Sequence, residues 1–298
     1  MDPVPTRNRE RYFNKIQAYI DRMPSLSTTV IKVLETCNNP RASANDLQRI
    51  ISLDPILTAR VLKLINSAYY SPGVPITSLA RAIVMLGLNT VKNLALSFAI
   101  LENLRTNGSL SAFTPDEFWT HSLCVGVIAK SLAAVKEDTA QGLEAFFVAG
   151  LLHDLGKIPL NRQFPEEYHR AWETAEQDLV ALRHCEFKLL GMDHCAVGSM
   201  IAKKWHLGAT LVETLSHHHN PEDSSEVDRD FVFIVSLANQ FANHLSIGSA
   251  GDCFTDNQLI EYLNRKVGVD WTILHELGQT VLNQIEKAQI FLEIAQKG

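Results

Sequence analysis

The sequence is poor in positive charge and lacks a charged tail. Lys and Arg together number 27 against 33 Asp and Glu, which gives a formal net charge of -6. Proteins that bind a phosphate backbone usually cluster Lys and Arg on one face, so we expect no nucleic-acid partner. No block of like charge is long enough to serve as an interaction tail.

The cysteines are few, scattered and without a Cys-x-x-Cys pair: Cys37, Cys124, Cys185, Cys195 and Cys253. An odd, dispersed set is typical of reduced thiols in a cytosolic protein rather than of a disulfide framework. The first ten residues have no apolar core and do not resemble a signal peptide. Polar residues interrupt each apolar stretch before the roughly 18 residues that a membrane span needs. We therefore predict a soluble, cytoplasmic protein without a membrane partner.

Alternating strand patterns are nearly absent, and helical signals occur along the whole chain. Strong helix starts lie at Ser43 with Asp46, at Asp54–Pro55, at Thr114–Pro115 and at Asp270, and others are predicted at Asn89 and at Thr255 with Gln258. Apolar residues make up 46% of the chain, enough for a packed globule. We predict an all-α fold with a helical N-terminal part over 1–108, a helical centre over 109–249 and a helical extension over 250–298. The clearest early linker is Asn107-Gly108-Ser109.

Six side chains that could bind a metal gather in the centre of the sequence, each on a predicted helix or at its end: His121, His153, Asp154, His194, His218 and His219. Imidazole and carboxylate are the usual ligands of iron, manganese, zinc and nickel, and facing helices of a bundle aim such side chains inward. A single helical histidine is more often capped or facing solvent, and a run such as His217–His219 can be only a polar loop. The sequence pattern alone leaves both interpretations open.

The segment Ala149-Gly150-Leu151-Leu152-His153-Asp154-Leu155-Gly156-Lys157 resembles the core motif of the HD superfamily of metal-dependent phosphohydrolases. The surrounding chain resembles the HDOD group in particular, through the segments 23–26, 53–68, 78–87, 118–122 and 238–239. The likeness therefore covers most of residues 20–245. It implies an HD-domain-like helical bundle that is preceded by a helical N-terminal subdomain.

The resemblance also implies a binuclear metal centre, commonly of iron or manganese, with zinc or nickel as other options. Its ligands fall on His121, His153, Asp154, His194, His218, His219 and, in the last position, Asn239. Lys157 matches a lysine that lies beside the phosphate in active members, so Asp154 and Lys157 are the implied catalytic residues. Glu117, one helical turn before His121, could reach a third metal or support a ligand, but the acid of a capping box is the favoured explanation.

Two departures from the pattern weaken the case for an enzyme. Asn239 stands where an aspartate is expected, and asparagine is a neutral, weaker ligand. The loop after His219 reads Asn220-Pro221-Glu222-Asp223-Ser224 and lacks the Gly-Tyr-Pro element of the branch that hydrolyses cyclic di-GMP. The resemblance then implies a bacterial signalling module that keeps a metal site and acts on a regulatory protein in trans, without efficient hydrolysis. A metal-dependent phosphohydrolase of nucleotides or cyclic nucleotides, and a sensor that binds a nucleotide without cleaving it, remain alternatives.

Overall fold

Helices account for the architecture of the computed structural model, which describes residues 6–37, 41, 43–104, 111–136, 142–252 and 254–297. No β-strand occurs in these ranges, which confirms the predicted all-α fold. The predicted linker at Asn107–Ser109 lies outside the described residues. Among the described cysteine side chains, those of Cys124, Cys185 and Cys195 are free thiols.

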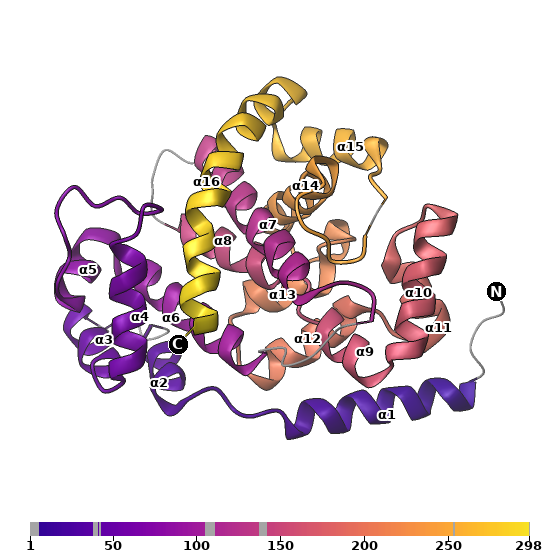
Figure 1. Ribbon diagram of the computed structural model, residues 1–298, viewed down its shortest axis with the longest axis horizontal. Coiled ribbons are helices and arrows are strands. Elements are labelled where there is room, and N and C mark those ends of the chain that lie inside the picture. The colour runs from indigo at the N-terminus through magenta and orange to yellow at the C-terminus, as the bar shows by residue number, and fades with distance from the viewer. Residues whose placement is uncertain are drawn as a thin grey trace.

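The N-terminal helices form an arm and a compact unit. The arm, α1, runs along the edge of the central helices and packs against α9, α11 and α12, whereas α2 to α6 pack on one another (Figure 1). The bounds are α1 Thr6–Arg22, α2 Thr28–Cys37, α3 Ala44–Ile51, α4 Pro55–Ile65, α5 Leu79–Leu86 and α6 Leu88–Asn103.

The centre of the molecule is built around two apolar helices, α7 and α8, with α14 packed against both. Shorter helices surround them and supply most of the polar side chains described below. The bounds are α7 Pro115–Lys136, α8 Leu143–Leu152, α9 Lys157–Gln163, α10 Pro165–Asp178, α11 Leu182–Leu190, α12 His194–Lys204, α13 Ala209–His217, the 3-10 helix η1 Pro221–Asp223, and α14 Arg229–Leu245.

The C-terminal helices are α15 (Asn257–Val267) and α16 (Trp271–Lys297), and both pack against earlier helices. In Figure 1, α16 runs between the N-terminal unit and the centre, and it packs against α4, α6 and α7. Its Phe291 ring stacks on Phe98 with centroids 4.8 Å apart and meets Phe147 at 5.6 Å. Because α16 packs across the predicted boundaries at 108 and 249, the three predicted parts share one continuous core, and the boundaries themselves stay a prediction.

Most of the predicted helix starts are confirmed. Ser43 and Asp46 form a capping box, and the side chains of Asp54 and Asp270 accept hydrogen bonds from the first turns of α4 and α16. The cap predicted at Thr255 is wrong, because the neighbouring Asp256 accepts the hydrogen bonds from Gln258 N and Leu259 N.

The helix start predicted at Asn89 also needs correction. Asn89 is not a cap, because α6 already begins at Leu88, directly after Gly87 turns the chain at φ 84°. Helix α8 ends at Leu152, and Gly156 directly precedes the short helix α9, which the sequence did not predict. The residues between them form the turn that carries the His–Asp pair.

Helix α7 is long and apolar enough to cross a membrane by length and composition alone, and α5 and α6 would qualify only together, as a pair bent by 116°. Within α7, 72% of the apolar window is buried inside the protein. A core helix of a soluble protein passes the same test, so this is weak support for a membrane span and is compatible with the predicted solubility.

Candidate metal centre

Two glycines bring the first predicted ligands together by letting α7 and α8 touch. A Cβ atom at Gly126 would lie 2.6 Å from the Phe147 carbonyl oxygen, and one at Gly150 would lie 2.7 Å from Gly126 Cα. Backbones can approach this closely only where both residues lack a side chain. The crossing places His121, on α7, near the end of α8, where His153 and Asp154 follow.

A third glycine brings the next ligand to the same place. A Cβ atom at Gly156 would lie 1.9 Å from the His194 carbonyl oxygen and 2.7 Å from Gly198 N. The first turn of α12 therefore rests directly on the turn that follows Asp154. Asp193 caps this helix by accepting a hydrogen bond from Ala196 N at 2.9 Å, which fixes His194 at its first position.

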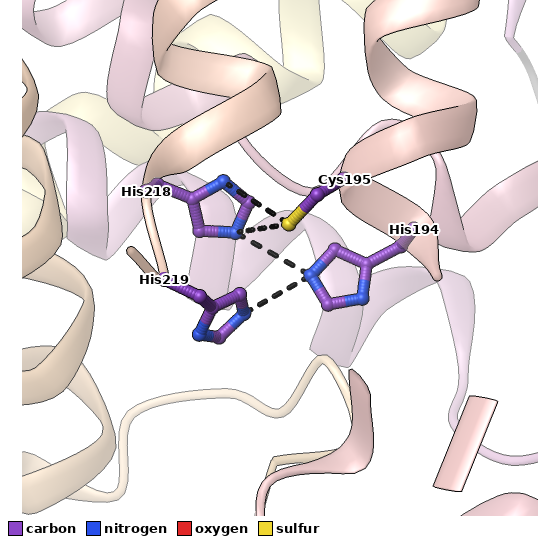
Figure 2. Close-up of side chains that lie close together, drawn as sticks. All are labelled: His194, Cys195, His218 and His219. Carbon is purple, nitrogen blue, oxygen red and sulfur yellow. Dashed lines mark hydrogen bonds between the residues drawn. The ribbon is translucent and has the colours of Figure 1, made fainter. Parts of the chain in front are cut away.

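The structure brings all seven predicted ligand residues into one buried site. Two groups of ligand atoms lie within metal-binding distance: His121, His153 and Asp154 form one, and His194, Cys195, His218 and His219 form the other. His218 and His219 follow α13 and face the first turn of α12 (Figure 2). Asn239, on α14, joins the first group, since its Oδ1 is 3.1 Å from His121 Nε2.

Hydrogen bonds on the far side of three imidazole rings decide which nitrogen faces the site. His153 Nδ1 donates to the Gly150 carbonyl at 2.7 Å, His194 Nδ1 to Glu186 Oε2 at 2.7 Å, and His218 Nδ1 to the Thr214 carbonyl at 3.1 Å. A neutral imidazole that donates through Nδ1 carries a lone pair on Nε2. The three Nε2 atoms are therefore available as metal ligands.

The Asp154 carboxylate lies between the two groups. Its Oδ1 is 3.3 Å from His194 Nε2 and 3.6 Å from His218 Nε2, whereas its Oδ2 is 3.2 Å from His153 Nε2 and 3.9 Å from His121 Nε2. Oδ2 also pairs with the Lys157 ammonium at 2.9 Å, but Oδ1 is buried without a hydrogen-bond partner, as are His153 Nε2 and His121 Nδ1. Acceptor atoms that face one another in a dry site repel unless a cation lies among them.

The spacing of these atoms fits metal ions. Metal–nitrogen bonds of about 2.1 Å place two ligands of one ion about 3.0 to 3.4 Å apart. His194 Nε2 lies 3.4 Å from His218 Nε2 and 3.0 Å from His219 Nε2. The donor set thus fits a binuclear centre in which Asp154 would contact both ions, His121 and His153 would hold one, and the three later histidines would hold the other.

Glu117 has a structural role. It accepts hydrogen bonds from Thr114 N at 3.0 Å and Thr114 Oγ1 at 2.8 Å, and its own N–H donates to Thr114 Oγ1 at 3.2 Å. These contacts complete the capping box that the sequence predicted for the start of α7. The carboxylate is therefore engaged at the helix end, as the simpler interpretation of Glu117 required.

Lys157 is buried beside the His–Asp pair and is held by two carboxylates. Its Nζ lies 2.9 Å from Asp154 Oδ2 and 2.6 Å from Asp252 Oδ2, and its side chain is 0% exposed. Burial opposes the ammonium charge, but Asp154 and Asp252 outweigh burial and raise the pKa of Lys157 above its ordinary value. Lys157 therefore stays charged and paired.

The loop that carries Asp252 closes over the first ligand. Asp252 Oδ1 accepts a hydrogen bond from Leu182 N at 2.9 Å, and Ser249 N donates to the Glu117 carbonyl at 3.1 Å. At Gly248, where φ is 66°, a Cβ atom would lie 2.4 Å from His121 N. This segment covers α7 at the level of His121 and leaves little space above it.

Electrostatics divide the site into two halves. Burial and the neighbouring His153 lower the pKa of His121 to about 3, so its imidazole is neutral. Burial also opposes charge at His218, but Cys195 and Asp154 outweigh it and raise the pKa of His218 to about 9. At His194, Glu186 and Cys195 outweigh burial and raise the pKa well above its ordinary value. At His219, by contrast, burial and the neighbouring His218 and His194 lower the pKa well below its ordinary value. His194 and His218 therefore attract positive charge, which either protons or a cation can supply.

Three polar residues of the site were not predicted as part of it. Glu186 holds His194, Asp252 holds Lys157, and Cys195 lies in the second ligand group. Cys195 had a signal in the sequence, since it directly follows a predicted ligand at a helix start. Glu186 and Asp252 had none, because they reach the site only through the packing of α11 and of the loop after α14.

Glu186→Gln is expected to weaken metal binding by about 10- to 100-fold, because an acceptor behind a ligating histidine fixes its tautomer and raises its basicity. The glutamine can keep a hydrogen bond but removes the charge. Titration of metal-stripped protein with zinc or manganese measures the change. Glu176→Gln, an exposed acid on α10, is the matched control. Equal affinity of the two variants would show that Glu186 does not support a ligand.

The helical fold and the buried His–Asp cluster, which suggests a metal site, are consistent with the HD superfamily. The HDOD domain matches residues 23–221, two thirds of the chain, and the chain belongs to the HDOD family. An uncharacterized protein of Treponema pallidum (strain Nichols) is 25% identical over 223 residues, which are 74% of this chain and 42% of that protein. The chain thus spans less than half the length of this curated relative.

Solved structures share the fold. An HDOD domain protein of unknown function from Geobacter sulfurreducens is 24% identical, with a TM-score of 0.73 and coverage of 96% of this chain and 99% of that one. A Shewanella amazonensis SB2B protein, named as a candidate phosphohydrolase, is 22% identical. Its TM-score is 0.68, and the match covers 92% of this chain and 97% of that one. A Marinobacter aquaeolei VT8 protein, named as a candidate signal transduction protein, is 17% identical. Its TM-score is 0.74, and the match covers 97% of this chain and 66% of that one.

Proposed function

We propose that this HDOD protein is a signal-transduction module that holds a binuclear metal centre as part of its structure and does not hydrolyse phosphoesters efficiently. The observation that carries the proposal is the closure of the site. His121, His153, Asp154, His194, His218 and Asn239 are each at most 2% exposed, and only His219 is half-buried. Structural metal sites are closed, whereas catalytic ones keep a position open for water or substrate.

The state of Lys157 supports the same function. A lysine that binds a phosphoryl group needs free N–H donors that point at the substrate. Here the ammonium is buried between Asp154 and Asp252. An incoming phosphate would have to displace Asp252, and the two anions would repel each other. The neutral Asn239 further reduces the charge that the ligands offer to a metal.

The N-terminal unit is the proposed surface for a regulatory protein that acts in trans. Four apolar side chains on or beside α4 and α5 are half to four-fifths exposed: Leu53, Ile56, Val84 and Met85. Exposed apolar side chains of this size can contribute to a protein-binding surface. A cytoplasmic location and a bacterial origin remain expectations of the same kind.

One observation favours the alternative, a metal-dependent phosphohydrolase. Asp154 presents one oxygen to each group of histidines, and a pair of metal ions joined in this way supplies a bound water with a lowered pKa and clamps an in-line displacement. In that case Lys157 would have to exchange Asp252 for the phosphate. A nucleotide that binds without cleavage would need the same exchange.

Metal content and turnover test these functions together. Protein purified without chelators is expected to contain a bound transition metal, in the first place iron or manganese. Less than about half an equivalent of metal per chain would contradict the metal centre. With added manganese or iron, turnover of a generic phosphodiester is expected to equal that of a His153→Ala control. Turnover clearly above the control would establish the hydrolase instead. A gain of activity in Asn239→Asp alone would identify Asn239 as the residue that limits hydrolysis.

A further inference from the structure

The second ligand group contains a sulfur atom. Cys195 follows His194 in the first turn of α12 and is 4% exposed. Its Sγ lies 3.9 Å from both ring nitrogens of His218, and one ligand atom of each of His194, Cys195, His218 and His219 fits within a 4.8 Å group. Figure 2 shows the sulfur directed at the His218 ring, on the side where His194 approaches.

An unpaired carboxylate oxygen points independently to a cation at this position. Asp154 Oδ1 is buried, has no hydrogen-bond partner, and lies 3.3 Å from His194 Nε2 and 3.6 Å from His218 Nε2. The half-buried His219 adds its Nε2 from the opposite side, at 3.0 Å from that of His194. Asp154 Oδ1 therefore lies beside the group that the three imidazole nitrogens and the Cys195 sulfur form.

The spacing of sulfur and nitrogen is also close to that of two ligands on one ion. Metal–sulfur and metal–nitrogen bonds of about 2.3 and 2.1 Å separate the two atoms by about 3.6 Å in a tetrahedral site. The distance here is 3.9 Å. The position at the start of α12, where the helix dipole favours negative charge, suits the thiolate form that binds metals.

We propose that Cys195 is a thiolate ligand of the second metal position, together with His194, His218 and His219. This inference rests on the proposed metal centre and adds to it a metal preference. A thiolate favours zinc, cobalt or iron(II), whereas manganese prefers oxygen ligands. The two positions of the centre would then differ in kind: the one at His121, His153 and Asn239 has only nitrogen and oxygen donors, and the one at α12 has a soft donor.

Cobalt(II) is the probe that tests the proposal, because a cobalt–thiolate bond gives a charge-transfer band in the near ultraviolet that nitrogen and oxygen ligands do not give. The metal-stripped protein is loaded with cobalt and its spectrum is recorded. We expect this band in the unmodified protein and in Cys185→Ser, a buried thiol outside the site. We expect Cys195→Ser and Cys195→Ala to lose the band while they keep the visible bands of bound cobalt. Circular dichroism shows whether each variant is folded.

The outcomes separate this proposal from the one it rests on. Visible cobalt bands without the charge-transfer band, or a band that survives in Cys195→Ser, would overturn the role of Cys195 and leave the metal centre intact. No bound cobalt in the unmodified protein would overturn both. In a competition between zinc and manganese, Cys195→Ser should shift the preference toward manganese by at least about tenfold, and an unchanged ratio would contradict the proposal.

Discussion

Lys157→Met is expected to lower the free energy of unfolding by about 3–5 kcal/mol, the cost of removing one partner from a buried ion pair. The methionine fills similar space, so the loss would come from charge. Without the ammonium, the Asp154 and Asp252 carboxylates face each other in a dry site. Chemical denaturation of metal-stripped protein measures the loss. All the proposed metal ligands remain in this variant, so bound metal should persist and offset part of the loss.

Two controls make the Lys157 result specific. Lys203→Met removes an exposed ammonium on α12 and should change stability by less than about 0.5 kcal/mol. Adding Asp252→Asn to Lys157→Met removes one of the stranded charges and should recover part of the lost stability, because the two residues are directly paired. A loss of under about 1 kcal/mol in Lys157→Met would mean that the pair is solvated, as a surface ion pair is.

Gly156→Ala should cost stability near the upper end of the range for overpacking, about 3 kcal/mol, and should also reduce bound metal. The added Cβ would lie 1.9 Å from a backbone carbonyl and 2.7 Å from a backbone nitrogen, so no side-chain rotation can relieve the contact. Helix α12 would have to move away from the turn after Asp154. His194 moves with it, and the second metal position loses its arrangement.

Denaturation and elemental analysis of the same sample test both parts of the Gly156 prediction. Gly208→Ala is the matched control, since an added Cβ there meets nothing within 4 Å and the backbone has φ -55°. Gly208 is the N-cap of α13, where alanine is slightly less favourable than glycine, so that variant should lose well under about 1 kcal/mol. If Gly156→Ala retained both stability and metal, α12 would not rest on the His–Asp turn as closely as the structure has it.

The sequence could predict those features of the fold that depend on residues close together in the chain. Four helix starts could be predicted from the local sequence, because the capping side chain accepts a hydrogen bond from a backbone N–H group a few residues ahead. These caps are Ser43, Asp54, Thr114 and Asp270. Thr255 failed because the adjacent Asp256 is equally able to cap. The helix Lys157–Gln163 was not predicted, because it is only seven residues long and directly follows a turn.

Only those residues of the site that belong to a recognisable sequence motif could be predicted. The metal-ligand residues were found through the His–Asp motif and the histidines that accompany it. The supporting residues were not, because they act across long sequence distances: Asp252 lies 95 residues from Lys157. No periodicity marks such a residue. The closure of the site was likewise invisible, since it follows from how Gly248 packs on His121.

The position of α16 has a consequence for how the protein folds. Its Phe291 ring packs against Phe98 on α6 and Phe147 on α8, two residues that lie far earlier in the sequence. Contacts between such distant residues form late in folding, because a long loop of chain must close first. Until α16 docks, the apolar surface that it covers on α6 and α8 is exposed, so this step is where the folding chain is most prone to aggregate.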